Sequence, residues 1–237
     1  MITDKKAFLD FHSHILPGVD DGSRDLDESR ALLDMLKEQG IETVMATPHF
    51  DADRERVESF VKRRNDSYQR LLSVMTPEMP NVRLGAEVAY YPGISRLDEL
   101  SKLCIEGTNL VLLEMPMSRW SRYTVDELVN MTSTRGVQVI IAHVERCLKY
   151  QDRSSLEAIY RSDVLLQINA SFIIELSTRR KAINLLKKGL VQLVGSDCHN
   201  VRSRKPKIGE AYEIISGRLG DDFVRKITNF GRSLIIN

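Results

Sequence analysis

The stretch VQVIIAH, residues 137–143, indicates both the fold and the place of its chemistry. Its valines and isoleucines are typical of a strand in a parallel sheet that is buried on both faces, and the run ends in a histidine. Similar short apolar runs recur along the chain, separated by longer amphipathic stretches. We expect seven strands, at residues 7–11, 42–47, 82–87, 109–115, 137–143, 163–169 and 190–196.

The amphipathic stretches predict helices. In the first of them, Asp25 and Glu28 have the spacing of a capping box, and Gly40 suits the C-terminal end. We expect helices at residues 25–40, 55–75, 124–135, 153–161, 175–188, 206–216 and 221–229. The alternation favours an α/β fold with parallel strands and outer helices, in the form of a (β/α)7 barrel. A doubly wound open sheet is the alternative.

The composition is that of an ordinary globular protein, and we expect one domain over residues 1–237. With 34 basic and 33 acidic residues, the charge balance indicates no nucleic-acid partner. The N-terminal MITDKKAFLDF lacks the apolar segment of a signal peptide, and no apolar run is long enough for membrane insertion. Three separated cysteines, Cys104, Cys147 and Cys198, indicate free thiols and a cytoplasmic enzyme.

Every histidine of the chain lies at the C-terminal end of a predicted strand or directly after it. These residues are His12, His14, His49, His143 and His199. Carboxylates occupy similar places: Asp20, Asp21, Glu87, Glu114 and Asp197. In a parallel barrel these strand ends meet at one rim, where active sites are built. A lone histidine is more often structural than a ligand, but five of five at strand ends favour a metal site.

Mixed imidazole and carboxylate ligands suit manganese, iron or zinc. About nine candidate ligands are too many for one ion, so we expect two or three ions bridged by carboxylates. Such clusters clamp the oxygens of a phosphoryl group, which indicates hydrolysis of a phosphate ester. Arg146 and Arg204 follow predicted ligands closely and could bind phosphate in a bidentate manner. Surface charge is the alternative for each arginine, and Arg202 lies close to Arg204.

The motifs resemble those of a known family, the bacterial protein-tyrosine phosphatases of the PHP (polymerase and histidinol phosphatase) superfamily. These are manganese-dependent enzymes of capsular and exopolysaccharide regulation. The matching stretches are DFHSHILPGVDDGSRD (10–25), ATPHF (46–50), GAEV (85–88), LLEMP (112–116), IAHVER (141–146) and VGSDCHN (194–200). They span nearly the whole chain. The pair of histidines is common to PHP proteins, whereas HSHILPGVDDG is much more specific to the tyrosine phosphatases.

The resemblance implies the distorted (β/α)7 barrel of the PHP domain and a role for each candidate residue. The first ion would be held by His12, His14, a bridging Glu87 and Asp197; the second by Glu114 and His143; the third by Asp21, His49 and His199. Asp20 would support the ligands without binding an ion. Arg146 and Arg204 would contact phosphate and assist the leaving group. The implied metal is manganese, as two or three ions, with iron or zinc as alternatives.

The implied activity is hydrolysis of phosphotyrosine in proteins, on the tyrosine-rich tail of a bacterial tyrosine autokinase that controls capsule or exopolysaccharide synthesis. A metal-bridging hydroxide would attack phosphorus in line, and the ions and arginines would neutralise the oxygens. The main alternative is a PHP phosphatase of small molecules such as histidinol phosphate. A PHP nuclease and a non-catalytic metal-binding regulator are further alternatives. The native metal, the kinase and the oligomeric state stay open.

Cys198 departs from the family pattern, which has a small residue such as alanine at this position. Cys198 with Arg204, and Cys147 with Arg153, also match the C-x5-R spacing of cysteine phosphatases. Both stretches lack the glycines with which such a loop wraps its amides around phosphate, so we expect neither cysteine to be catalytic. A redox or ligand role for Cys198 stays open.

Aromatic side chains follow two of the predicted strands. Trp120 and Tyr123 come after the fourth strand, and Tyr90 and Tyr91 after the third. They could stack on a substrate ring or simply pack on the barrel, and the residues themselves favour neither.

Overall fold

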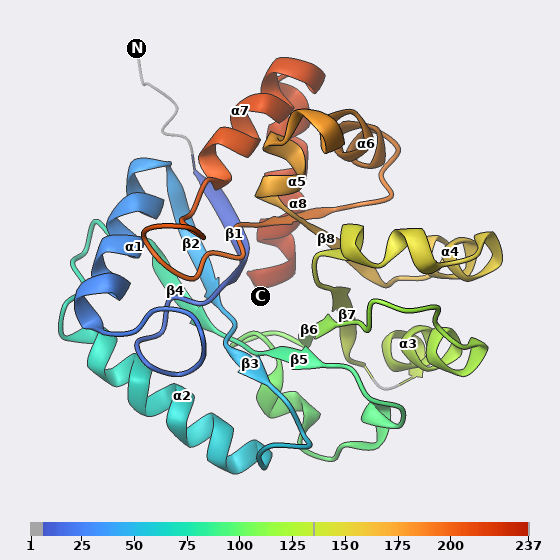
Figure 1. Ribbon diagram of the computed structural model, residues 1–237, viewed down its shortest axis with the longest axis horizontal. Coiled ribbons are helices and arrows are strands. Elements are labelled where there is room, and N and C mark those ends of the chain that lie inside the picture. Colours follow the sequence, from blue (N-terminus) through green and yellow to red (C-terminus); the bar gives the residue numbers. More distant parts are fainter. Residues whose placement is uncertain (1–6, 135, 237) are drawn as a thin grey trace.

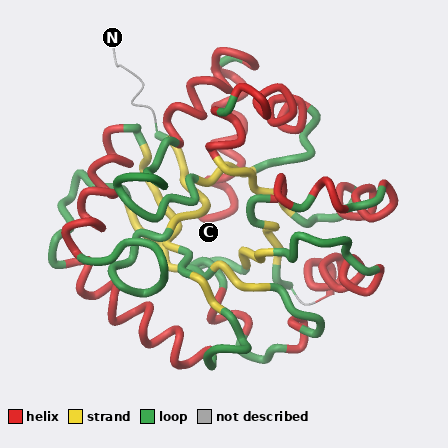
Figure 2. Tube along the Cα trace, in the orientation of Figure 1, coloured by secondary structure: helices red, strands yellow, loops and turns green. Residues whose placement is uncertain are grey.

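Parallel strands form the centre of the molecule, and helices surround them (Figures 1 and 2). The computed structural model describes residues 7–134 and 136–236. Its strands are β1 (Phe8–Ser13), β2 (Ile41–Ala46), β3 (His49–Phe50), β4 (Asn81–Leu84), β5 (Glu87–Ala89), β6 (Leu110–Glu114), β7 (Gln138–Ile141), β8 (Leu165–Asn169) and β9 (Leu193–Gly195). All ladders between them are parallel.

Two of the seven predicted strand positions are occupied by broken strands. Thr47 and Pro48 separate β2 from β3, and Gly85 and Ala86 separate β4 from β5. Pro48 has no N–H to donate to a ladder, which explains the first break. Because β2 pairs with β4 and β3 pairs with β5, the two broken strands stay next to each other on both sides of the breaks. Counted this way, the seven predicted positions are confirmed.

The first and last strands, β1 and β9, lie next to each other, and the sheet therefore curls into a distorted barrel. The ladders run β1–β2–β4 and β3–β5–β6–β7–β8–β9. The amide of Asp197 donates to the carbonyl of His12 at 2.8 Å, and the amide of His14 donates to the carbonyl of Cys198 at 2.9 Å. These bonds join the chain after β9 to β1. The strands follow one another in chain order, as in a barrel, and the open doubly wound alternative is not adopted.

The helices also follow the prediction. They are α1 (Leu26–Glu38), α2 (Val57–Leu72), α3 (Arg122–Thr134), α4 (Arg153–Tyr160), α5 (Ala170–Ile174), α6 (Leu176–Lys187), α7 (Ile208–Leu219) and α8 (Asp221–Ile235). Asp25 caps α1 by accepting from the amide of Glu28, but the Glu28 carboxylate turns back to Arg24 rather than to Asp25, so the predicted capping box is incomplete.

Several elements differ from the prediction. The short helix α5 and four 3-10 turns were not expected; the turns are Ile94–Arg96, Leu100–Leu103, Val144–Arg146 and Leu148–Tyr150. Helix α8 extends six residues beyond its predicted end at 229. Arg135, the last residue of one predicted helix, and residues 1–6, which belong to the N-terminal stretch predicted not to be a signal peptide, lie outside the described residues. None of the helices in residues 7–134 and 136–236 is long and apolar enough to cross a membrane.

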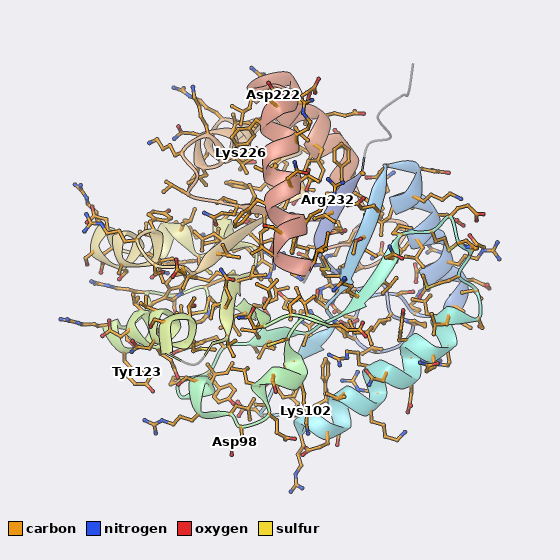
Figure 3. The ribbon with its side chains drawn as sticks, turned by 180° about the vertical axis from the view of Figure 1, so that it is seen from behind. Asp98, Lys102, Tyr123, Asp222, Lys226 and Arg232 are labelled. Atoms are coloured by element: carbon orange, nitrogen blue, oxygen red, sulfur yellow. The ribbon has the colours of Figure 1, made fainter. Side chains whose placement is uncertain are left out.

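Helix α8 closes the end of the barrel at which the strands begin. Seen from behind, it lies across the strands (Figure 3). Its Arg232 donates to the carbonyl of Ala7 at 2.6 Å, directly before β1. Gly231 lies so close to the barrel that a Cβ there would be 2.9 Å from Leu9 Cδ1. Behind the helix is an apolar inner core of Leu9, Phe11, Met45, Ile105, Leu110, Leu112, Ile140, Ala142, Leu165, Leu193 and Ile235. The opposite end of the barrel is where the predicted ligands lie.

Candidate metal centre

A bulge in β1 brings the first two histidines to the site. The register with β2 shifts between Asp10 and Ser13, where β1 has one more residue than its partner. Such a bulge changes the direction of the side chains that follow it. Phe11 thus belongs to the inner core, while the next residue, His12, faces the polar end of the barrel. The Nε2 atoms of His12 and His14 are 3.1 Å apart.

Glu87, at the start of β5, lies at the centre of the site. Its Oε2 atom is 3.1 Å from His12 Nε2, 3.2 Å from His14 Nε2 and 3.1 Å from His49 Nδ1. Its Oε1 atom accepts from His143 Nε2 at 2.7 Å. One buried carboxylate therefore contacts four of the five histidines.

Asp21 lies between His49 and the fifth histidine, His199, on the outer side of the site. Its Oδ1 atom is 3.4 Å from both His49 Nε2 and His199 Nε2. The neighbouring Asp20 instead accepts from His14 Nδ1 at 2.7 Å and from the amides of His49 and Gly22. Asp20 thereby orients His14 so that its other nitrogen, Nε2, faces the site.

Asp197, directly after β9, borders the site next to two arginines. Its Oδ1 atom is 3.6 Å from His14 Nε2 and 3.8 Å from His12 Nε2. Arg146 donates to its Oδ2 atom at 2.6 Å, and Arg204 donates to its Oδ1 atom at 2.8 Å. Both predicted arginines thus reach the same carboxylate, one at each oxygen.

The structure brings all nine predicted ligand residues to one rim, and seven of them form three overlapping groups that could each hold an ion. Within each group the ligand atoms lie within 4.8 Å of one another. The groups are His12–His14–Glu87, His49–Glu87–Glu114 and His14–Asp21–His49–His199. The grouping differs from the predicted one in three respects. Glu114 groups with His49 and Glu87, whereas His143 bonds to Glu87 and lies 3.6 Å from Glu114. Asp197 lies beside the first group rather than in it, and His14 belongs to the third group as well as the first.

Two buried atoms of these residues test whether the site fits metal ions. Glu87 Oε2 and His199 Nε2 are buried and make no hydrogen bond. A buried polar atom without a partner is costly, and cations among these nitrogen and oxygen atoms would provide the missing partner. The donor set, five imidazoles and four carboxylates, therefore fits manganese, iron or zinc.

The electrostatics of the site favour binding of a cation. Although burial opposes the carboxylate, the charge of His12 and the close imidazole nitrogens of His12, His14 and His143 hold the pKa of Glu87 well below its usual range. Burial likewise opposes the charged form of His14, but its bonds to Asp20 and Glu87 raise its pKa to about 10. Without a cation, protons therefore remain on the site. Metal ions must displace them, so metal affinity rises with pH.

The amino-acid sequence matches one family over almost its full length. Residues 8–236 correspond to the family described as capsular polysaccharide synthesis, CpsB/CapC. The chain belongs to the CpsB/CapC family. The relationship predicted from the motifs is thereby confirmed.

Relatives of the CpsB/CapC chain carry names that state an activity. The tyrosine-protein phosphatase CpsB of Streptococcus pneumoniae is 30% identical over 229 residues, which cover 90% of this chain and 91% of the relative. The tyrosine-protein phosphatase YwqE of Bacillus subtilis is 26% identical over 236 residues, covering 97% and 92%. A putative tyrosine-protein phosphatase CapC of Staphylococcus aureus is 27% identical over 209 residues, covering 83% and 78%.

Solved structures share the fold. One comes from a study of YwqE from Bacillus subtilis and CpsB from Streptococcus pneumoniae, named there as metal-dependent tyrosine phosphatases. It matches with a TM-score of 0.81 at 24% identity and covers 96% of this chain and 94% of its own. A histidinol phosphate phosphatase from Lactococcus lactis, solved with zinc, L-histidinol and phosphate, matches with a TM-score of 0.56 at 12% identity, covering 93% of both chains. The predicted parallel α/β barrel is confirmed.

Two of the predicted ligand residues of this CpsB/CapC protein have a strained backbone. His143 and Asp197 have positive φ angles, of 29° and 53°. Few residues other than glycine adopt this region, and such residues cluster at functional sites. Each follows the end of its strand, β7 or β9, where the chain turns sharply and aims the side chain into the rim.

Three polar residues behind the ligands were not predicted from the sequence. Asp10 is buried and accepts from the amides of His12 and Ser196. Gln167 and Asn169 are buried on β8 and bond to the ligand residues. The signal was present in the sequence: a polar side chain inside an apolar strand, as in LLQIN (165–169), requires a partner.

The cysteines lie away from these groups of ligands. Cys198 is fully buried in a second apolar cluster, the outer core, which includes Leu32, Val44 and Ile208. Burial raises the pKa of its thiol. Cys147 points its thiol at the carbonyls of Met115 and Pro116, and burial raises its pKa to about 11. A cysteine nucleophile needs an accessible thiolate. The geometry thus agrees with the expectation that neither cysteine is catalytic.

The aromatic residues after β5 and β6 mostly pack on the barrel. Trp120 is buried and its indole N–H donates to the carbonyl of Pro116 at 3.3 Å. The hydroxyl of Tyr90 donates to Glu127 at 2.8 Å. Tyr91 packs, half-buried, against the outer core, whereas Tyr123 is exposed at the start of α3. Trp120 and Tyr90 therefore have structural roles.

Proposed function

We propose that this protein is a metal-dependent phosphatase that hydrolyses phosphotyrosine in proteins. The observation that carries the proposal is the convergence of the nine predicted ligand residues, Glu87 among them, at one rim that two arginines border. Membership of the CpsB/CapC family and the names of its relatives support the same activity. The substrate we infer is the tyrosine-rich tail of a bacterial tyrosine autokinase that controls capsule or exopolysaccharide synthesis.

The metal we infer is manganese, in two or three ions, with iron or zinc as alternatives that share these ligands. Three groups of residues would hold the ions: His12, His14 and Glu87; His49, Glu87 and Glu114; and His14, Asp21, His49 and His199. Asp197 would complete the first group and His143 the second, because each lies next to residues of that group. When bound, such ions supply a nucleophile at neutral pH and neutralise charge on a phosphoryl group.

Arg146 and Arg204 are placed to bind the phosphoryl oxygens. Each guanidinium directs one nitrogen to Asp197 and is about 40% exposed, at 37% and 41%. A guanidinium has five N–H donors, so each arginine keeps donors for phosphate. Asp197 holds the guanidinium groups of Arg146 and Arg204 at the edge of the site and so orients them before substrate arrives. The tyrosine phenolate, with a pKa of about 10, leaves more readily than an alkoxide and needs less help from an acid.

The exposure of the site suits a phosphate carried on a protein. His12 and His14 are buried at its base, whereas His49, Glu114 and the two arginines are partly exposed above them. A phosphate therefore enters from the side of the rim that carries the arginines. A flexible tail can deliver its phosphotyrosine to such an open rim.

Phosphate release from a phosphotyrosine peptide and from histidinol phosphate tests the proposal, with Mn²⁺ or with EDTA. We expect hydrolysis of the peptide in Mn²⁺ only, and its loss in His14→Ala. Preference for histidinol phosphate would instead favour the small-molecule alternative. Activity that survives EDTA but disappears in Cys198→Ser would favour a cysteine phosphatase.

The arginine assignment has a matched control two residues away. Arg202 lies exposed on the same loop as Arg204. We expect Arg204→Ala to lower kcat/KM for the peptide by roughly 10²-fold, the scale of one lost transition-state donor. Arg202→Ala should stay within about twofold, because distant surface charges contribute little. Equal effects in the two variants would contradict the role of Arg204.

A further inference from the structure

Strand β8 ends at the metal centre without supplying a predicted ligand, yet it places two amide side chains behind the ligands. Gln167 is 0% exposed and Asn169 is 4% exposed. Two buried amides need defined partners, because a buried polar group without a partner is costly. Their partners are ligand residues on both sides of β8.

Hydrogen bonds determine the orientation of both amides. The backbone N–H of His143 donates at 2.7 Å to Gln167 Oε1, which must therefore be oxygen. The other end of this amide, Nε2, donates to Asn169 Oδ1 at 3.0 Å. Asn169 Nδ2 in turn donates to Asp197 Oδ2 at 2.8 Å. The chain of bonds runs in one direction only, from the backbone of His143 to the carboxylate of Asp197.

The same Gln167 oxygen lies next to the first ligand. His12 Nδ1 is 3.4 Å from Gln167 Oε1, and a carbonyl oxygen can only accept. Nδ1 of His12 must therefore carry the hydrogen. In the neutral imidazole this leaves the lone pair on Nε2, the atom that lies 3.1 Å from Glu87 Oε2. A hydrogen bond to the far nitrogen of a histidine commonly selects the tautomer that binds metal.

The backbone is built to accommodate this chain of amides. The hydrogen-bonded chain of amides begins at His143 and ends at Asp197. These are the non-glycine residues with positive φ angles among the residues that the structure describes. On β9, a Cβ at Gly195 would lie 2.7 Å from Gln167 Nε2 and 2.6 Å from His12 Cβ. Only glycine leaves room there for the amide and the imidazole together.

We propose that Gln167 and Asn169 are positioning residues of the metal centre. Gln167 selects the Nδ1–H tautomer of His12, and Asn169 holds the carboxylate of Asp197 between Arg146 and Arg204. This inference rests on the proposed function in so far as the site must bind metal. It adds a role for β8, the strand without a ligand.

Binding of Mn²⁺ to the full chain, by competition with a chelating dye, tests the inference. Gln167→Met removes all three contacts of the amide, with His143, His12 and Asn169, and we expect metal affinity to fall roughly 10- to 100-fold, as for other lost partners of ligands. The control is Gln192→Met. Gln192 accepts from the amide of Leu166 at 3.0 Å, near the other end of β8, and its variant should bind Mn²⁺ within about twofold of wild type.

A second variant separates the two roles and guards against misfolding. Gln167→Glu keeps oxygens for the amide of His143 and for His12 Nδ1 but loses the donor to Asn169. In ¹⁵N spectra of the Zn²⁺-loaded protein, we expect the Nδ1–H tautomer of His12 in wild type and Gln167→Glu. We expect its loss in Gln167→Met. Melting in EDTA checks that each variant is folded.

Unchanged Mn²⁺ affinity in folded Gln167→Met, or an unchanged His12 tautomer, would overturn the inference. Should Gln167→Met fail to fold, wild-type Mn²⁺ affinity in Gln167→Glu would overturn the role of Asn169. A wild type that binds Mn²⁺ but releases no phosphate from phosphotyrosine would overturn the proposed function alone. Failure of the wild type to bind Mn²⁺, Fe²⁺ or Zn²⁺ would overturn both.

Discussion

The two ends of the barrel are built from opposite chemistry. At the end where the strands begin, α8 lies over an apolar inner core, and Gly231 allows it to approach Leu9 closely. At the other end, imidazoles, carboxylates and guanidinium groups crowd around Glu87. Apolar burial stabilises the first end, whereas the second holds like charges and unpaired polar atoms that disfavour folding. The first end thus maintains the fold that the second end requires.

Backbone strain follows the same division. Among the non-glycine residues that the structure describes, His143 and Asp197 have positive φ, and both belong to the polar end. Each such residue costs of order 1–3 kcal/mol and persists only where its surroundings hold it. The chain of amides through Gln167 and Asn169 joins these two residues. The contrast between the polar end and the apolar end predicts different effects for four substitutions, at Glu87, Leu110, Glu127 and Cys198, from the largest expected effect to the smallest.

The largest effect is expected at the centre of the polar end. Glu87→Gln removes the carboxylate that contacts four histidines, and kcat for a phosphotyrosine peptide should fall by about 10³-fold or more, since a single electrostatic contact is worth 10²–10³. Stabilisation by Mn²⁺ in thermal melting should fall with it, while the melting midpoint in EDTA changes little. Glu157→Gln, on the exposed face of α4, is the control. Full activity in Glu87→Gln would show that the centre lies elsewhere.

The inner core should show the reverse pattern. Leu110→Ala removes a fully buried side chain, and we expect a loss of about 2–5 kcal/mol in the free energy of unfolding. For a domain of this size the midpoint should drop by roughly 5–20 °C. Activity per folded molecule should stay close to wild type. Leu72→Ala, which alters an exposed leucine, serves for comparison. A selective loss of kcat in Leu110→Ala would break the proposed separation of the two ends.

A smaller effect is expected at Glu127, which ties the loop after β5 to α3. Glu127 accepts from the Tyr90 hydroxyl, from the Gly93 amide and from both the amide and the hydroxyl of Ser95. Although burial favours the neutral acid, the Ser95 hydroxyl, the Gly93 amide and the other donors lower the pKa of Glu127 below its ordinary value of 4.5. Its stabilisation is therefore present above pH 4.5 and lost as pH falls through the folded-state pKa.

Denaturant unfolding at several pH values measures this contribution. Glu127→Gln should cost about 1–3 kcal/mol at neutral pH, because charged hydrogen bonds are lost. The difference from wild type should shrink as the buffer becomes more acidic than pH 4.5. The loss in Leu110→Ala should not depend on pH in this range. An unchanging difference for Glu127→Gln down to pH 3 would show that its charge contributes nothing.

The smallest effect is expected at Cys198. Although this residue lies between Asp197 and His199, its side chain is buried in the outer core and not in the rim. Cys198→Ala should keep phosphotyrosine hydrolysis within about twofold and lower stability by roughly 1 kcal/mol, because a small cavity replaces the sulfur. Loss of activity in a folded, metal-loaded variant would instead place the thiol among the catalytic groups.

Much of the architecture was predictable because it depends on local pattern. Short apolar runs predicted the seven strand positions, and the rule that parallel strand ends meet at one rim predicted that the histidines would lie together. The break after β4 and the bulge in β1 were not predictable, since both depend on the register with a neighbouring strand. Helix α8 extends further than its pattern suggested because its last turn packs on the barrel, where Ile235 joins the inner core.

The site was predictable for residues whose chemistry is rare and less so for residues whose role depends on a partner. Imidazoles at strand ends were informative by themselves. Gln167 and Asn169 were not, because an amide is common in proteins and only its neighbours reveal its role. The separation of Asp20 from Asp21 came from the family resemblance. In the structure Asp20 bonds to His14 Nδ1, and Asp21 faces His49 and His199. Their roles stay predictions.

The graded exposure of the ligands has a kinetic consequence. The side chain of His12 is 0% exposed, whereas those of His49 and Asp21 are 39% and 65% exposed. Ions held at these two depths would exchange with the surroundings at different speeds, because a chelator reaches the outer group first. Stepwise removal of metal would therefore empty the outer group before the inner one and leave protein molecules that are only partly loaded with ions. Two preparations of the protein with the same total metal content would then differ in kcat if the metal had been added or removed in a different order.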